Sequence, residues 1–327
     1  MSTSTSRRFV KQLRHQENIN QIFMISAKQL RPNRNGNLYL QAELSDRSGS
    51  IETRLWNASE QDYRNIENGD YVVVEGATQL FQGNLQLIAN SIRRAELTEV
   101  QEEDFLTLPG TAIDQMAMRL AEILRGVKQP HLRTLAECFL MDDAFMRKFC
   151  KAPAGVKNHH AYQGGLLEHV LGLCELVLRV ADLYPEVDSE MLLMGAVLHD
   201  MGKIDELTYE RDLAYSDAGQ LLGHILIAIS ILDVKVREAD RLSGEPFPEA
   251  ALLELKHMIA SHHGQYEYGS PKLPMTLEAV ALHHLDNLDA KLHSFHQLLR
   301  DDPNVDSPWT LYHANLGRKL YKRIGEV

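Results

Sequence analysis

Residues 189–203 read SEMLLMGAVLHDMGK, a run of apolar and small residues that ends in a histidine, an aspartate and a lysine. The apolar residues recur at three- and four-residue spacing, which predicts a helix that is largely buried. His199 shares a helical face with Leu192 and Ala196. A buried imidazole followed at once by a carboxylate needs a partner, and a divalent cation is a suitable one. The stretch therefore predicts a helix that presents His199 and Asp200 to a metal ion inside a bundle.

The residues after this pair suggest how a phosphate could be held. Gly202 is expected to adopt the left-handed conformation that ends many helices. That conformation would turn Lys203 back toward the same site, where its positive charge would face a phosphate group.

Four further segments on either side of this stretch carry histidine or aspartate. They are GGLLEH ending at His169, GH at 223–224, SHHG at 261–264 and HLDNLDA at 284–290. Each falls on or at the end of a predicted helix, and 13 of the 15 histidines lie at or after position 159. Imidazole and carboxylate ligands suit divalent ions such as Mn, Fe, Mg or Zn.

The chain from 111 onward has the apolar spacing of helices nearly throughout. The periodic segments are 111–150, 164–183, 189–200, 220–241, 249–263, 276–300 and 310–324. The pattern predicts an all-α bundle of roughly seven helices.

The first part of the chain has a different pattern. Between Ile19 and Ala95, five short β-rich runs are separated by turn residues, and 58–66 reads as a short helix between the third and fourth runs. This is the element order of an OB-fold barrel. The expected organisation is a flexible arm at 1–18, an all-β OB-fold nucleic-acid-binding domain at 19–97, an acidic linker at 98–110 and an all-α helical domain at 111–327.

Composition narrows the class of protein. The chain has 327 residues, of which 44% are apolar, and a net charge of −11, which argues against global disorder and against a uniformly basic nucleic-acid coat protein. Residues 1–97 nonetheless carry 12 Lys and Arg against 10 Asp and Glu. Three cysteines without CxxC spacing, no apolar signal segment and no long apolar run predict a cytoplasmic protein that does not span a membrane.

His169, the His199-Asp200 doublet and Asp286 have the order and spacing of the H…HD…D signature, so the helical domain resembles the HD-domain metal phosphohydrolases. With NHHAYQGGLLEH at 158–169 and a preceding OB-fold, the chain resembles in particular the YhaM-type 3′–5′ exoribonucleases, over about 19–300. The resemblance implies a divalent-metal nuclease that trims single-stranded RNA, and sometimes DNA, from the 3′ end to 5′-mononucleotides. It also implies manganese as the favoured metal.

The resemblance assigns residues to two metal ions per chain. The expected ligands are His169, His199, Asp200, His224, His262 and Asp286, with Asp200 bridging the two ions. Asp200 and Lys203 are the catalytic candidates, since Lys203 would stabilise charge on the phosphate oxygens. His160, His263 and Asp289 are candidates for supporting contacts. Asp289 lies three residues from Asp286, so it could either replace Asp286 as the ligand or hold a ligand histidine by a hydrogen bond.

Strand alternation predicts a nucleic-acid-binding face on the barrel. Residues two apart share a face of a strand, so Tyr39, Arg54 and Trp56 point outward from the second and third strands. These strands form the usual OB-fold binding surface, where bases stack on aromatic rings. Phe81 in the hairpin at 79–84 is a further stacking candidate. Packing of Trp56 against the 58–66 helix is the structural alternative.

Two other functions fit the same residues. A phosphohydrolase acting on small nucleotides or cyclic dinucleotides, with a regulatory OB-fold, would need the same metal ligands. A binding protein with an inactive HD domain would need only the barrel, and the complete ligand set argues against it. The expected partner is single-stranded RNA, with single-stranded DNA and a second copy of the chain left open.

Overall fold

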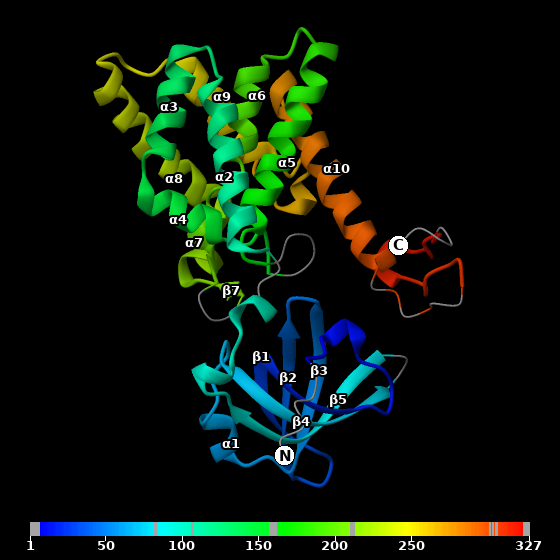
Figure 1. Ribbon diagram of the computed structural model, residues 1–327. Helices are drawn as coiled ribbons and strands as arrows, with labels where there is room; N and C mark the ends of the chain where they lie inside the picture. The colour runs from blue at the N-terminus through cyan, green and yellow to red at the C-terminus, as the bar shows by residue number, and fades with distance from the viewer. Residues whose placement is uncertain are drawn as a thin grey trace. The chain divides into compact units, whose positions relative to one another are not determined.

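The computed structural model describes residues 7–81, 84–105, 108–156, 162–209, 213–300, 302, 304 and 307–322. The chain divides into two compact units, with the boundary between Pro109 and Gly110. The first unit is the β-barrel and the second is the helical bundle (Figure 1).

Five strands form the first unit. They are β1 (Asn18–Pro32), β2 (Leu38–Asp46), β3 (Gly49–Trp56), β4 (Tyr71–Phe81) and β5 (Asn84–Arg94). They close a barrel in the order β1-β2-β3-β5-β4, in which β3 and β5 pair in parallel and the pairs β1–β2, β2–β3, β4–β5 and β1–β4 are antiparallel. Helix α1 (Glu60–Arg64) lies between β3 and β4, begun by Ser59, which accepts a hydrogen bond from the Asp62 amide. The predicted OB-fold barrel is confirmed.

The alternation of side chains follows the predicted pattern. Leu40, Ala42 and Leu44 of β2 and Ile51 and Leu55 of β3 are buried in the barrel core. The intervening residues face outward or are only partly covered. The apolar face of each strand therefore fills the barrel and leaves the polar face available to solvent.

The described part of the segment expected as a flexible arm, residues 7–17, packs on the barrel. A short 3₁₀ helix, η1 (Val10–Gln12), lies on the barrel, with the Val10 amide donating to Asp46 Oδ2 at 2.8 Å. The Gln16 amide donates to the Thr78 carbonyl, and Leu13 is buried. The flexible-arm prediction was wrong for residues 7–17. The polar composition of this segment gave no sign that Leu13 is buried or that the main chain is hydrogen-bonded to the barrel.

The acidic segment expected as a linker also packs within the first unit. It contains two 3₁₀ turns, η2 (Leu97–Glu99) and η3 (Glu102–Asp104). The Phe105 ring lies 4.7 Å from the Tyr71 ring, and Asp104 pairs with Arg7 at 3.1 Å. Residues 98–105 are therefore an extension of the barrel, and Gly110 begins α2 of the second unit.

The described residues of the second unit form nine α-helices. They are α2 (Gly110–Arg125), α3 (Pro130–Leu140), α4 (Asp143–Lys151), α5 (Gly165–Val180), α6 (Ser189–Leu198), α7 (Lys203–Glu206), α8 (Asp217–Ser243), α9 (Glu249–Ser261) and α10 (Leu277–Arg300). A short 3₁₀ turn, η4 (Ala181–Leu183), follows α5, and a second, η5 (Tyr266–Tyr268), lies between α9 and α10. Two-residue strands β6 (Leu207–Thr208) and β7 (Ala214–Tyr215) pair between α7 and α8. The predicted helical domain is confirmed.

The segment at 310–324, predicted as a helix, has a different structure in its described part. Trp309 bridges to Tyr321 and His313 to Arg318, and a 3₁₀ turn, η6, spans Ala314–Leu316. Gly317 has a φ of 63°, a left-handed conformation in the turn between His313 and Arg318. The helix prediction was wrong here because the spacing of apolar residues does not reveal where the chain reverses direction.

Helix α8 is, among the described helices, the one long and apolar enough to cross a membrane by length and composition. A core helix passes the same test, and α8 packs against α3 and α7. Its Lys235 is buried and paired with Asp142 at 2.8 Å and with Glu238 at 2.7 Å. These contacts place one face of α8 against the bundle, and 33% of its most apolar 18-residue window is buried.

Candidate metal centre

The structure brings all six predicted ligands to one place in the bundle. His169 lies on α5, His199 caps the C-terminus of α6 and is followed by Asp200, and His224 lies on α8. His262 caps the C-terminus of α9, and Asp286 lies on α10. The packing of these helices therefore brings together residues that lie more than one hundred positions apart in the sequence.

Three of these residues form a first triad: His169, His199 and Asp286. The Nε2 atom of His169 lies 3.4 Å from Nε2 of His199 and 3.2 Å from Oδ1 of Asp286. Ligand atoms on one ion are about 3.0–3.4 Å apart when each bond is about 2.1 Å long. The first triad has the size of a cage for one divalent ion.

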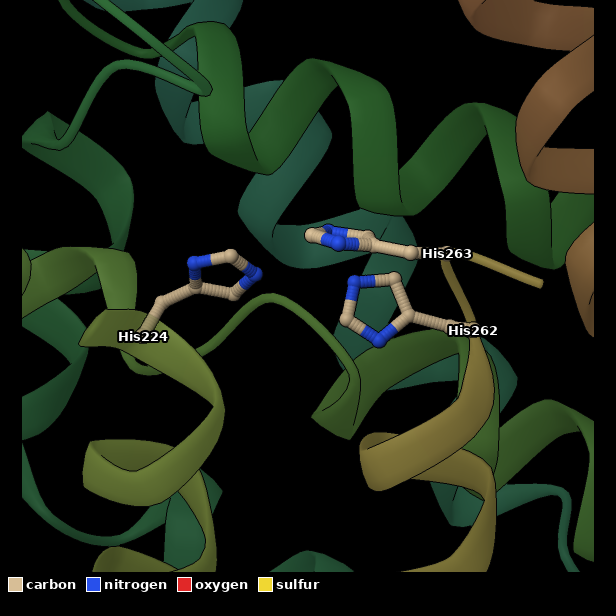
Figure 2. A group of neighbouring side chains, drawn as sticks. All are labelled: His224, His262 and His263. Carbon is tan, nitrogen blue, oxygen red and sulfur yellow. The ribbon is translucent and has the colours of Figure 1, made fainter. Parts of the chain in front are cut away.

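A second triad consists of His224, His262 and His263, whose imidazole rings lie side by side in Figure 2. One ligand atom from each lies within 4.8 Å of those of the other two. The sequence assigned His263 a supporting role, whereas the structure groups it with the two predicted ligands. Its place follows from the turn after α9, which lets adjacent histidines face the same space.

Asp200 lies between the two triads. Its Oδ2 atom is 3.4 Å from Nε2 of His199 in the first triad. Its Oδ1 atom is 3.5 Å from Nε2 of His224 and 3.7 Å from Nε2 of His262 in the second triad. The two oxygens of one carboxylate therefore face different triads.

All five histidines present the same ring nitrogen to the centre. In each ring, Nδ1 lies 2.8–3.0 Å from a carbonyl or carboxylate oxygen: Asp289 for His169, Ala196 for His199, Glu206 for His224, Ile259 for His262 and Tyr268 for His263. Because Nδ1 donates outward, Nε2 is directed inward. A second hydrogen bond of this kind is what fixes the orientation of metal-binding histidines.

The barrel residues predicted to contact nucleic acid also lie together. The Tyr39 and Trp56 rings are 5.0 Å apart, and the Arg54 guanidinium lies 6.0 Å from the Trp56 ring and 5.5 Å from the Phe81 ring. Trp56 is 42% exposed and Phe81 is 47% exposed. We call these four residues the aromatic face. Arg54 is additionally held by Glu52 at 2.8 Å.

Comparison with known proteins places both units. The OB-fold nucleic acid binding domain family matches residues 24–95, and the HD domain family matches residues 166–291. The chain is similar to several proteins named 3′–5′ exoribonuclease YhaM. The one from Bacillus velezensis is 36% identical over 84% of this chain and 86% of its own length. The one from Geobacillus sp. is 36% identical over 89% of this chain and 87% of its own length. The one from Bacillus subtilis is 34% identical over 86% of this chain and 88% of its own length.

The chain belongs to the YhaM family of 3′–5′ exoribonucleases. The resemblance seen in the H…HD…D residues is thereby confirmed. Among solved structures, the second OB-fold domain of replication protein A from Methanococcus maripaludis is 21% identical over 27% of this chain and 92% of that chain, with a TM-score of 0.23. At this score it adds nothing to the assignment.

The second unit contains an HD domain, and an HD domain implies dependence on a divalent metal ion. The residues present fit that requirement. Oδ1 of Asp200, Nε2 of His224 and Nε2 of His262 are buried without a hydrogen-bond partner among the described residues. Unpaired buried polar atoms are costly, and three that face one space indicate a cation-binding site.

Protonation states also suit metal binding. Burial disfavours the charged form of Asp200, but Lys203 and His199 outweigh it and hold the pKa of Asp200 well below its usual value. Burial likewise disfavours charged Asp286, yet the hydrogen bond from His169 lowers its pKa. Burial lowers the pKa of His262. Ionised carboxylates and neutral imidazoles are the forms that bind metals.

His169 has the opposite tendency. Burial disfavours its charged form, but Asp286 and Asp289 raise the pKa of this histidine to about 9. Its Nδ1 proton is directed at Asp289, 2.8 Å away. This is one of the two roles that spacing on the helix suggested for Asp289. Asp286 faces Nε2 of the same ring, on the metal side.

Gly202 does not have the left-handed conformation that the sequence suggested. Its φ is −64° and its ψ is −17°, so it is right-handed helical. The glycine is needed for space, since a Cβ atom there would lie 2.0 Å from the His224 carbonyl oxygen. Lys203 still reaches the site, and its Nζ donates to Asp200 Oδ2 at 2.6 Å.

Two supporting residues were missed from the sequence. Glu206 is buried at the end of α7, and its Oε1 accepts hydrogen bonds from the His224 amide at 2.9 Å and from His224 Nδ1 at 3.0 Å. His283 donates from Nδ1 to the His262 carbonyl at 2.8 Å. A carboxylate one helical turn after Lys203 was the signal for Glu206. Nothing local distinguished His283 from its neighbours on the helix.

His160 lies outside the described residues. The three cysteines are unpaired with one another and do not belong to either triad. Burial raises the pKa of Cys150 to about 11 and that of Cys174 to about 12, so both stay protonated thiols. The described ligands are therefore nitrogen and oxygen atoms alone.

We expect Glu206→Ala to weaken metal binding at the second triad by about 10- to 100-fold, because His224 loses the bond that orients its ring. The first triad should keep its affinity. Titration of the metal-free chain with Mn²⁺, followed by calorimetry, would resolve the two sites. Glu206→Gln retains an acceptor and should recover most of the affinity. Asp205→Ala, at the neighbouring carboxylate that pairs with Lys148, is the control. Equal affinities in Glu206→Ala and wild type would remove this role.

Proposed function

We propose that this chain is a metal-dependent 3′–5′ exoribonuclease that trims single-stranded RNA to 5′-mononucleotides. The observation that carries the proposal is a pair of metal-binding triads joined by Asp200. The same chain contains an exposed aromatic face on an OB-fold barrel. The relatives are named 3′–5′ exoribonucleases, which supports the polarity and the substrate.

Two divalent ions are proposed per chain. His169, His199 and Asp286 would hold one, His224 and His262 would hold the other, and Asp200 would contribute an oxygen to each. The geometry adds His263 as a further ligand of the second ion. Manganese is the metal that the family resemblance implies, and nitrogen and oxygen ligands without a thiolate are compatible with it as well as with iron, magnesium or zinc. Such ions would supply Lewis acidity and a water of lowered pKa for hydrolysis.

The side chains around the ions position the substrate. Burial disfavours the charged form of Lys203, but Asp200 outweighs it and raises the pKa of the lysine, which therefore stays charged. Its ammonium group is placed to stabilise negative charge on the non-bridging phosphate oxygens. Asp200 holds this lysine by the oxygen that faces the first triad, so one carboxylate orients both the ions and the phosphate-binding group.

The barrel is proposed to bind the strand upstream of the cleaved nucleotide. Aromatic rings stack on bases of any sequence, and an arginine beside them can contact the backbone phosphate. Single-stranded DNA has the same stacking faces, so we include it as a slower or alternative substrate. Free cysteines fit the reducing cytoplasm as the place of action.

The test is digestion of single-stranded RNA and DNA carrying a label at either end, with Mn²⁺ or with a chelator. Label at the 3′ end should be released first and as a mononucleotide, and a duplex should stall the reaction. A circular single strand cut as fast as a linear one would contradict an exonuclease. Hydrolysis of mononucleotides or cyclic dinucleotides alone would support the small-nucleotide phosphohydrolase instead.

We expect Trp56→Ala combined with Arg54→Ala to weaken binding of long strands at least tenfold, since each lost stacking contact costs about 1–3 kcal/mol. Metal content should be unchanged. Cleavage of a dinucleotide should hardly change, because so short a substrate does not need the aromatic face. Binding is measured by fluorescence anisotropy across a series of salt concentrations. Arg64→Ala, an exposed arginine of α1, is the control. Unaltered kinetics of the double variant on long RNA would assign the barrel another role.

A further inference from the structure

A cavity of about 450 Å³ adjoins the second triad. Lys203, His224 and Glu206 line its polar part, where Glu206 is bonded to His224, and Ala154, Gly155, Val156, Leu207 and Tyr215 line the rest. Pockets for small ligands have volumes of about 300–1,000 Å³, so this one is large enough for a single nucleotide.

The non-polar part of the cavity suits a flat apolar group. Ala154 and Leu207 are buried, at 3% and 4% exposure, so they form a fixed floor. Tyr215 is 51% exposed and offers its ring to an occupant. A nucleobase has two π-faces and stacks on a tyrosine without needing a particular sequence.

The Tyr215 backbone is held rigidly beside α7. Tyr215 pairs with Leu207 in the small β6–β7 sheet. The next residue, Ser216, donates from its amide to the Glu206 carbonyl at 2.9 Å and from its hydroxyl to the Asp205 carbonyl at 2.7 Å. Lys203 and Tyr215 thus belong to two short segments that are hydrogen-bonded to each other.

We infer that this cavity binds the 3′-terminal nucleoside of the substrate, with Tyr215 stacking on its base. The inference rests on the proposed function and names the subsite for the departing nucleotide. A phosphodiester at Lys203 and His224 has one nucleoside on its 3′ side, and the cavity has room for one. The match in size to a single nucleoside is what removal of one residue at a time requires. Tyr215 is in this sense a specificity residue for a terminal base.

The test compares two ligands that differ only by the base, adenosine 5′-monophosphate and ribose 5-phosphate. Binding of each to the Mn²⁺-loaded full chain is measured by equilibrium dialysis. Wild type should prefer the nucleotide by roughly tenfold or more. Tyr215→Ala should lose that preference while its affinity for ribose 5-phosphate and its metal content stay unchanged. Tyr215→Phe keeps the ring and should keep the preference. Tyr184→Ala, at another exposed tyrosine of this unit, should behave as wild type.

The outcomes separate this inference from the proposed function. If Tyr215→Ala retains the preference for the nucleotide, or if it alters metal content, the stacking role is overturned. If the preference depends on Tyr215 but wild type does not trim RNA from the 3′ end, the subsite stands and the exonuclease proposal fails. On RNA, the same variant should lose the difference in kcat/KM between a strand with a normal 3′ terminus and one with a 3′-terminal abasic ribose.

Discussion

Asp200→Ala is expected to lose both metal ions and to lower turnover roughly a thousandfold or more on every substrate. One oxygen of this carboxylate faces the first triad and the other faces the second, so a single substitution opens both. It also releases Lys203, whose Nζ is held by the same group at 2.6 Å. Metal ions supply several kcal/mol of charge stabilisation in such reactions, and about 1.4 kcal/mol corresponds to a tenfold change in rate.

Elemental analysis of the purified variant measures the metal content, and single-turnover kinetics on end-labelled RNA measures the rate. Strand binding through the barrel should remain. Asp205→Ala is the matched control, since this aspartate lies in α7 but pairs with Lys148 outside the triads. Wild-type metal content in Asp200→Ala would rule out its assignment as the bridging ligand.

Gly202→Ala is expected to give one of the largest losses of stability available from a single methyl group. The added Cβ would lie 2.0 Å from the His224 carbonyl oxygen and 2.8 Å from the Ala228 amide nitrogen. Both contacts are with main-chain atoms, so no rotamer change relieves them, and α7 and α8 must separate. We expect a free energy of unfolding lower by about 3 kcal/mol or more. The same displacement should carry His224 out of the second triad and weaken metal binding there.

Urea unfolding with and without Mn²⁺ measures both effects. Gly110→Ala is the control, because a Cβ atom there would have nothing within 4 Å and its backbone needs no left-handed conformation. Its stability should stay within about 0.5 kcal/mol of wild type. A Gly202→Ala protein with wild-type stability would show that the two helices separate without cost.

The fold could be predicted because its local signals agree with one another. Leu40, Ala42 and Leu44 alternate with polar residues on β2, and turn residues bound each strand. In the bundle, apolar spacing marked the helices, and Pro130 and Asp142 divide the first helical run into α2, α3 and α4. Alternation, apolar spacing and turn residues all lie within the predicted element or within a few residues of it.

The candidate site was predictable only in part. His169, His199 and Asp286 could be named because their order and spacing have a recognisable pattern. Glu206, His283 and the spatial role of Gly202 depend on which helices touch, and this is set by packing between distant segments. Residues 7–17 show the same limit, because several of their bonds to the barrel, such as Val10 to Asp46 and Gln16 to Thr78, join positions more than thirty residues apart.

The five helices that meet at Asp200 make folding and metal binding parts of one equilibrium. The ligands run from His169 on α5 to Asp286 on α10, and no short segment contains a complete triad. The unfolded chain therefore brings no complete triad together, and each proposed ion would bind almost only to the native bundle. At a free metal concentration about 100 times the dissociation constant, one such ion adds about 2.7 kcal/mol to the stability of the native state. The thermal unfolding midpoint of this unit should consequently rise with the concentration of free metal ion.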